Sequence, residues 1–131
     1  NAYTNYEKQI APARTFCLLS EVTELAKQGL IKWGNVGNAV IIVDTDIDGD
    51  EVNLFKEKFG IKFHRGSRGL YKSQQLRFKN EPVRHKTLDL IGDLALLGMP
   101  IKGHVTAIKS GHKGNVEFAR LLRKEFKDQF K

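Results

Sequence analysis

The chain has 131 residues, which is enough for one domain of modest size but too few for two. Hydrophobic residues make up 40% and charged residues 28%, which is a globular balance, and no apolar run approaches the roughly 20 residues that a membrane span needs. The formal net charge of +7 favours an anionic partner, which could be nucleic acid, an acidic membrane surface or a phosphorylated ligand. The single cysteine, Cys17, excludes an internal disulfide and fits a cytoplasmic location.

The first part of the chain predicts two short helices around a buried segment. Residues 4–13 form a helix that Thr4 or Asn5 caps, and residues 15–19 form the buried segment. A second helix begins at Ser20, which caps it. We expect its inner face at Val22, Leu25 and Ala26, and its end at Gly29.

The middle of the chain predicts one buried strand. Residues 34–38 form a turn, and the short apolar run 39–43 (AVIIV) forms a strand buried on both faces. An acidic loop, 44–51, precedes a helix at 52–59. The basic, glycine-punctuated segment 61–72 predicts no single type of element.

The last part predicts a long helix, a strand and a final helix. Residues 83–97 form the clearest helix, with Pro82 in its first turn, and residues 103–109 alternate as a strand. After a turn at 110–114, Asn115 caps a helix that runs to Lys127. The expected core positions of the two helices are Leu88, Ile91, Leu94 and Ala95, and then Phe118, Leu121, Leu122 and Phe126.

This order of elements predicts an α+β fold, a two-layer sheet-and-helix domain. We expect residues 1–131 to form a single domain, with an inserted strand-helix-strand at about 30–80. The chain begins at Asn1 without an initiator methionine, so we expect it to be part of a longer product.

The helix that carries His85 and Asp89 has the most informative spacing. These residues are four apart, so their side chains project from one face of the helix. An imidazole nitrogen and a carboxylate oxygen at this spacing can share a zinc ion, and a catalytic zinc site has three protein ligands. Asp93 continues the same face, and Lys86 at its side could meet a phosphate. The alternative is a surface ion pair, because the same spacing on an exposed helix produces one.

A second candidate is the glycine-flanked run SGHKGN at 110–115. A loop at the junction of a strand and a helix can present His112 to a site, where a histidine acts as a general acid or stabilises an oxyanion. A plain surface turn is the alternative, and these residues alone favour it.

Four runs in order then identify a family resemblance. The runs are IAPARTF, GLIKWGNVGNAV, RHKTLDLIGDLALLG and GHVTAIKSGHKGN. Together they resemble the C-terminal portion of the UDP-3-O-acyl-N-acetylglucosamine deacetylase family of lipid A synthesis, over nearly the whole chain, and segment 44–72 matches least. The resemblance implies zinc-dependent hydrolysis of the N-acetyl amide of UDP-3-O-acyl-N-acetylglucosamine in the bacterial cytoplasm.

The resemblance also implies roles for individual residues. His85 and Asp89 match two of the family's three zinc ligands. His112 matches a histidine that assists the tetrahedral intermediate and the leaving group, and Asp93 matches the carboxylate that orients it. Implied substrate contacts are Lys86 at the nucleotide phosphates, Thr15 and Phe16 near the reacting group, Glu21 near the sugar, and Leu19, Val22, Gly34, Asn35, Ala39 and Ile41 along an acyl passage. For any single one of these passage positions, an ordinary core residue is the favoured alternative.

Two parts of the family's active site have no match in the chain. These are the third zinc ligand, a histidine, and the general base, a glutamate. We expect the N-terminal half of the same enzyme to supply both, and the isolated chain to be inactive or to bind zinc weakly. Some relatives are fused to a hydroxyacyl carrier-protein dehydratase, and the basic end of the chain, 120–131, could begin such a junction.

Two other functions remain open from the sequence. Asp44, Asp46, Asp48 and Gly49 fit the start of a calcium loop, but Phe55 stands where the loop needs a glutamate, which favours a solvated acidic turn. A basic nucleic-acid-binding module is suggested by Arg65, Arg68, Tyr71, Lys72, Arg77, Phe78 and Lys79. No nucleic-acid motif accompanies these residues, and a phosphate-bearing substrate explains the same charge, so we expect no nucleic-acid partner.

Overall fold

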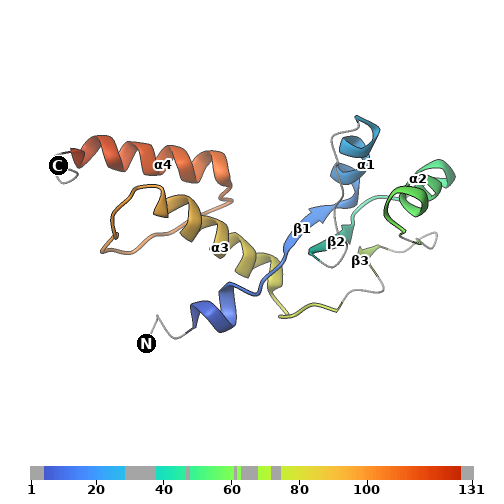
Figure 1. Cartoon of the computed structure of the whole chain (residues 1–131), viewed down its shortest axis with the longest axis horizontal. Helices are drawn as coiled ribbons and strands as arrows, with labels where there is room; N and C mark the ends of the chain where they lie inside the picture. Colours follow the sequence, from blue (N-terminus) through green and yellow to red (C-terminus); the bar gives the residue numbers. More distant parts are fainter. Residues whose placement is uncertain are drawn as a thin grey trace. The chain divides into compact units, whose positions relative to one another are not determined.

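The computed structural model describes residues 5–28, 38–46, 48–60, 62, 68–71 and 75–127, which form helices and one mixed sheet (Figure 1). The predicted α+β class is confirmed. The chain divides into two compact units: unit 1 is Asn1–Ala13 with Val83–Lys131, and unit 2 is Arg14–Pro82. That residues 1–131 make one domain stays a prediction. Among the described residues, no helix is both long and apolar enough to cross a bilayer.

Unit 2 is built on a three-stranded sheet in the order β1-β2-β3. Its strands are β1 (Thr15–Leu18), β2 (Ala39–Val43) and β3 (Gly69–Leu70). β1 runs parallel to β2, with Phe16 opposite Val40, and β3 runs antiparallel to β2, with Leu70 opposite Ile42. The apolar run therefore forms the central strand, and three of its five residues are buried, which confirms the predicted strand.

Two helices complete the core of unit 2. They are α1 (Leu19–Lys27) and α2 (Gly49–Phe59). Leu19 of α1 and Phe55 of α2 are fully buried against Ile41 and Val43 of β2, and Val22 packs against this cluster. The predicted inner position of Leu25 is wrong, because the buried face of α1 is centred on Leu19 and on Thr23, one turn further on. The side chain of Ala26, Gly29 and the predicted turn at 34–37 lie outside the described residues.

Two aspartates of the β2–α2 loop accept hydrogen bonds from backbone N–H groups in the first turns of α1 and α2. Ser20 lies inside α1 and does not cap it; instead Asp44 accepts hydrogen bonds from the Ser20 N–H (3.0 Å) and hydroxyl (2.6 Å). Asp48 caps α2 by accepting from the Glu51 N–H (2.8 Å), and the Glu51 carboxylate accepts from the Asp48 N–H (3.4 Å). Because of this capping box, α2 begins three residues earlier than predicted.

Unit 1 contains one π-helical turn and two α-helices. These are η2 (Tyr6–Ile10), α3 (Glu81–Ala95), whose first two residues belong to unit 2, and α4 (His112–Glu125). The predicted helix at 83–97 is confirmed in position, and within the predicted helix at 4–13 the structure has the π-helical turn at Tyr6–Ile10. Asn5 makes no side-chain cap hydrogen bond there, and Thr4 lies outside the described residues. Pro82 is the second residue of α3, where a missing N–H costs nothing, and Gly98, at φ 81, follows the end of the helix.

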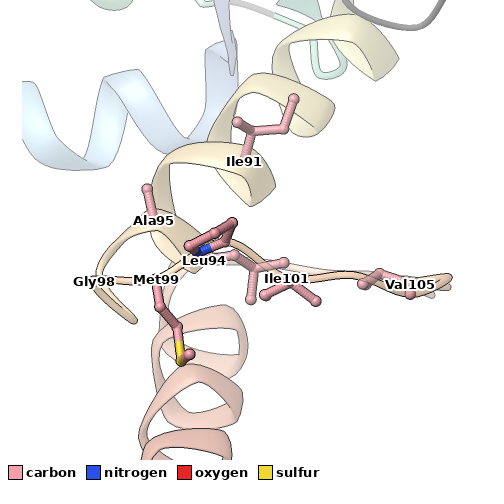
Figure 2. A pocket seen from close by; sticks show the side chains of 9 residues that line it. Ile91, Leu94, Ala95, Gly98, Met99, Ile101 and Val105 are labelled. Atoms are coloured by element: carbon pink, nitrogen blue, oxygen red, sulfur yellow. The ribbon is translucent and has the colours of Figure 1, made fainter. Parts of the chain in front are cut away.

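The apolar stripes predicted as core are largely open in the described part of unit 1. Ile91, Leu94 and Ala95 of α3 line an open pocket together with the 98–105 loop (Figure 2). In α4 the expected core residues Phe118, Leu121 and Phe126 are 43–56% exposed, whereas Asn115 and Ala119 are buried. The predicted inner faces are therefore wrong at Ile91 and Ala95 of α3 and at these three positions of α4, whereas Leu94 is half-buried. On α4, burial follows the face that contacts α3 through the hydrogen bond from Asn115 to Asp93 rather than the apolar face.

The predicted strand at 103–109 is also wrong. These residues are exposed and form no strand in the described part of the chain. Alternation alone does not make a strand, because its backbone groups need a paired neighbour. The predicted cap at Asn115 is wrong too: α4 begins at His112, and its cap is Gly111, which makes no side-chain cap hydrogen bond.

Candidate metal centre

One face of α3 brings the predicted metal ligands together. The Nε2 atom of His85 lies 3.3 Å from the Oδ1 atom of Asp89, and the two side chains are only 17% and 11% exposed. A pair this well buried is not the exposed surface ion pair that the sequence left open. Both residues belong to unit 1, so this geometry lies within one compact unit.

The ring of His85 is oriented by a backbone carbonyl. Its Nδ1 atom lies 3.0 Å from the carbonyl oxygen of Ala13. Because a carbonyl oxygen only accepts hydrogen bonds, Nδ1 carries the proton, and a neutral ring then has its lone pair on Nε2. A partner on the other ring nitrogen is the usual arrangement around a metal-binding histidine.

Lys86 orients the second candidate ligand. Its Nζ atom lies 2.7 Å from Oδ2 of Asp89, which leaves Oδ1 turned toward His85. When the ring is neutral, the lone pair of His85 Nε2 therefore faces Asp89 Oδ1, an arrangement that a cation stabilises. Two ligand atoms bound at about 2.0–2.1 Å by a tetrahedral zinc ion lie about 3.3 Å apart. The residues thus fit the metal that the sequence predicted.

A second histidine, His112 of α4, contacts Asp93, the next carboxylate along the same face of α3. The Nδ1 atom of His112 lies 2.9 Å from Oδ2 of Asp93, and the Asn115 amide donates to the same oxygen at 2.9 Å. Burial raises the pKa of Asp93, but the hydrogen bonds from Asn115 and His112 outweigh it, so its pKa stays below the ordinary value. An ionised Asp93 can only accept, so His112 Nδ1 carries the proton.

The free nitrogen of His112 points back to the candidate metal pair. Its Nε2 lies 3.8 Å from Oδ1 of Asp89, while the His112 side chain is 67% exposed. A histidine held by a carboxylate on one nitrogen and open on the other can donate a proton or stabilise a developing negative charge. Of the two interpretations of the 110–115 run, the geometry favours the histidine presented to a site.

Three contacts escaped the sequence analysis, two of them at this site and one within unit 2. Asn115 was predicted as a cap, although its position three residues after His112 does place it on the same side of a helix. The Ala13 carbonyl lies 72 positions from His85, and no local pattern indicates it. The same holds for the buried pair of Arg14 and Glu81, which are 67 positions apart.

Within the described residues, no group of three or more histidine, cysteine or acidic side chains could hold a metal ion. Two of the predicted ligands, His85 and Asp89, lie together in the described part of unit 1. A catalytic zinc needs three protein ligands. The predicted third ligand, from the N-terminal half of the enzyme, stays a prediction.

The other predicted site residues belong to unit 2 or lie outside the described residues. Gly34 and Asn35 lie outside the described residues. Thr15 and Glu21 are exposed, and Phe16 is half-buried in β1. Of the predicted acyl-passage residues, Leu19 and Ile41 are core residues, Val22 packs on that core and Ala39 is half-buried in β2. Their roles toward a substrate stay predictions.

The acidic loop gives its carboxylates to protein donors. Asp44 binds Ser20, Asp46 forms an ion pair with Arg68 (3.1 Å), and Asp48 caps α2. The hydrogen bond from the Ser20 hydroxyl is the main cause that lowers the pKa of Asp44. The three carboxylates that a calcium loop would aim at one ion therefore have three different partners, which favours the structural interpretation.

Two residues of the suggested nucleic-acid surface are also engaged. Arg68 is paired with Asp46. The Tyr71 hydroxyl donates to the Lys62 carbonyl (3.0 Å) and accepts from its N–H (3.1 Å), and the Tyr71 ring packs on the core of unit 2. A ring in this position is not a free stacking platform.

Comparison with known proteins identifies the family of the chain. The sequence profile of a deacetylase family, "UDP-3-O-acyl N-acetylglycosamine deacetylase" (LpxC), matches residues 1–59 and 64–124. The chain belongs to this family. It is 48% identical over 120 residues to the "Bifunctional enzyme LpxC/FabZ" of Chlorobaculum tepidum, covering 89% of this chain and 26% of the relative.

Two further relatives show the same pattern of coverage. A protein of Porphyromonas gingivalis with the same bifunctional name is 40% identical over 125 residues, covering 95% of this chain and 27% of that protein. The "UDP-3-O-acyl-N-acetylglucosamine deacetylase" of Chlamydia felis is 39% identical over 121 residues, covering 92% of this chain and 35% of that protein. The chain thus spans about a quarter to a third of the length of these relatives.

Proposed function

We propose that this chain forms part of the active site of a zinc-dependent deacetylase that removes the N-acetyl group from UDP-3-O-acyl-N-acetylglucosamine in bacterial lipid A synthesis. The observation that carries the proposal is the approach of two candidate ligand atoms, His85 Nε2 and Asp89 Oδ1, to 3.3 Å. Both atoms are left available, because the Ala13 carbonyl contacts the other ring nitrogen of His85, Nδ1, and Lys86 contacts the other oxygen of Asp89, Oδ2. Membership of the deacetylase family supports the same reaction.

His85 and Asp89 would hold the zinc ion, which supplies a Lewis acid for the acetamide carbonyl and lowers the pKa of water. The N-terminal half of the enzyme would add a third ligand, a histidine, and a glutamate as general base. The chain covers only about a quarter to a third of the length of these relatives, so such an N-terminal half would correspond to a part of them that this chain does not match.

His112 would hold the proton that the leaving amine needs. Asp93 fixes the ring through Nδ1, so the proton that moves is the one at Nε2, on the side of Asp89. A cationic ring in this position also stabilises negative charge on the carbonyl oxygen. Acetate and the free amine of the glucosamine are the products.

The remaining residues would bind the substrate. Lys86 would reach the diphosphate while it keeps Asp89 in place, and Thr15, Phe16 and Glu21 would meet the reacting group and the sugar. The acyl chain would follow the passage at Leu19, Val22, Gly34, Asn35, Ala39 and Ile41. Because two relatives are named "Bifunctional enzyme LpxC/FabZ", we include a fused hydroxyacyl carrier-protein dehydratase as a partner domain. The reaction would take place in the cytoplasm.

The test is acetate release from UDP-3-O-acyl-N-acetylglucosamine by the full-length gene product, with zinc content measured on every sample. His85→Ala and Asp89→Ala should lose both zinc and activity. His104→Ala, which changes an exposed histidine outside the cluster, should keep both. His112→Ala should keep zinc and lose about 10²- to 10⁴-fold in rate, as expected for a general acid. A wild-type protein that holds no zinc and releases no acetate would refute the proposal.

A further inference from the structure

The contact between Arg14 and Glu81 is the most completely buried ion pair in the described part of the chain. The Glu81 side chain is fully buried, and that of Arg14 is 11% exposed. Oε1 of Glu81 accepts from the N–H and the Nε of Arg14, both at 2.9 Å, and Oε2 accepts from Arg14 Nη2 (3.0 Å) and the Arg77 N–H (2.7 Å). Four hydrogen bonds therefore hold this carboxylate, and the two from charged Arg14 nitrogens are of the strong kind.

Each member of the pair adjoins one side of the contact that orients His85. Arg14 follows Ala13, the residue whose carbonyl oxygen lies 3.0 Å from His85 Nδ1. Glu81 precedes His85 by four residues, one turn earlier on α3. Arg14 is thus one peptide bond away from Ala13, and Glu81 is one helical turn away from His85.

The Arg14 backbone N–H takes part in the same network. It belongs to the peptide group whose oxygen is the Ala13 carbonyl, since that peptide joins residues 13 and 14. Because the peptide group is planar, a hydrogen bond from its N–H to Glu81 also fixes the direction of its C=O. The carboxylate of Glu81 therefore controls the orientation of the oxygen that His85 faces.

We propose that Arg14 and Glu81 form a positioning pair, which aims the Ala13 carbonyl at His85 Nδ1 and so keeps His85 Nε2 available for the metal. This inference rests on the proposed metal site. Neither residue is a ligand, so both would affect metal binding indirectly, through the Ala13 carbonyl and the ring of His85. Loss of a group that orients a metal ligand typically weakens metal affinity by about 10- to 100-fold.

The first experiment determines the protonation pattern of His85 in the metal-free, full-length protein. Histidine-selective ¹⁵N labelling and the spectrum of His85→Gln assign the ring signals. The wild type should show the proton on Nδ1 and the lone pair on Nε2. Glu81→Gln, which keeps the shape of the side chain but removes its charge, should shift the ring toward a mixture of tautomers. Arg14→Lys, which keeps the charge but not the forked contact, should shift it less.

The second experiment measures zinc affinity by competition with a chelator in the same proteins. Glu81→Gln should bind zinc about 10- to 100-fold more weakly than the wild type. Phe55→Leu is the matched control, because it destabilises the core cluster of unit 2, which includes neither Arg14 nor Glu81, and should leave affinity and tautomer unchanged. Glu117→Gln, at the exposed Arg120–Glu117 pair, is the control for charge.

The results separate this inference from the proposed function. Unchanged tautomer and affinity in Glu81→Gln would overturn the positioning role, and so would an equal loss of affinity in Glu81→Gln and Phe55→Leu, which indicates a general loss of stability. A wild-type protein that binds no zinc, but whose His85 tautomer still depends on Glu81, would support the positioning of the ring and overturn the proposed metal chemistry.

Discussion

The buried carboxylate of Glu81 makes the start of α3 sensitive to acid. Its pKa is lowered to about 2 from an ordinary value of 4.5, first by the hydrogen bonds from the Arg14 side chain and further by the N–H groups of Arg14 and Arg77, which together outweigh the opposing effect of burial. A carboxyl group whose pKa is lower in the folded state stabilises the fold above its unfolded pKa. That stabilisation is lost as the pH falls through the folded pKa.

The magnitude follows from the two pKa values. Linkage converts the difference between 4.5 and about 2 into roughly 3 kcal/mol of stability at neutral pH. About 2 kcal/mol of this is lost between pH 6.5 and pH 3, which is about a thirtyfold change in an equilibrium constant. Glu81→Gln cannot ionise, so it should lack this stabilisation at pH 6.5 and also lack this part of the pH dependence.

Amide hydrogen exchange on the full-length protein measures the effect locally. The amides of Arg14 and Arg77 both donate to Glu81 and so report the opening of this contact. After correction for intrinsic exchange rates, their protection should fall about thirtyfold more in the wild type than in Glu81→Gln between pH 6.5 and pH 3. Glu117→Gln should behave like the wild type. The same decline in the wild type and in Glu81→Gln would refute the assignment of a low pKa to Glu81.

Three further predictions concern single side chains. Gly60→Ala should lower the free energy of unfolding by about 1 kcal/mol, because Gly60 follows the end of α2 in the left-handed conformation, at φ 65. Gly49→Ala, in the first turn of the same helix, should not lower it, and urea unfolding measures both variants. Asn115→Ala should cost about 1–3 kcal/mol in the same assay, since it removes a buried donor to Asp93, and Asn53→Ala on the exposed side of α2 should change stability by less than about 0.5 kcal/mol. Calcium added to the metal-free protein in a calorimeter should give no binding heat at the acidic loop, because Asp44, Asp46 and Asp48 already bind protein groups; a stoichiometric heat that Asp46→Asn abolishes would contradict this.

The elements that the sequence predicted well are those fixed by local chemistry. Pro82 near the start and Gly98 after the end mark α3. The five-residue apolar run is typical of a strand that is covered on both faces, and β2 does occupy the centre of the sheet. The spacing of His85 and Asp89 likewise depends only on helix geometry, which is why both side chains could be placed on one face.

The elements that failed depend on partners that the local sequence does not contain. Residues 103–109 alternate like a strand, but no described strand lies beside them. Asn115 had the right chemistry for a cap, and it became the donor to Asp93 because α4 starts three residues earlier, at His112. In both cases a tertiary contact, or its absence, decided between local structures of similar energy.

The difference between a surface ion pair and a metal site on α3 has the same origin. A histidine and an aspartate four residues apart share a face in either case, so the spacing cannot distinguish the two. What distinguishes them is the atom of each group that remains available. The Ala13 carbonyl, 72 positions away, takes Nδ1 of His85, and Lys86 takes Oδ2 of Asp89. Only one of these two partners is local, so a helix pattern could indicate the carboxylate's orientation but not the ring's. The buried pair of Arg14 and Glu81 supplies that missing non-local constraint, which is why its loss should affect metal binding rather than stability alone.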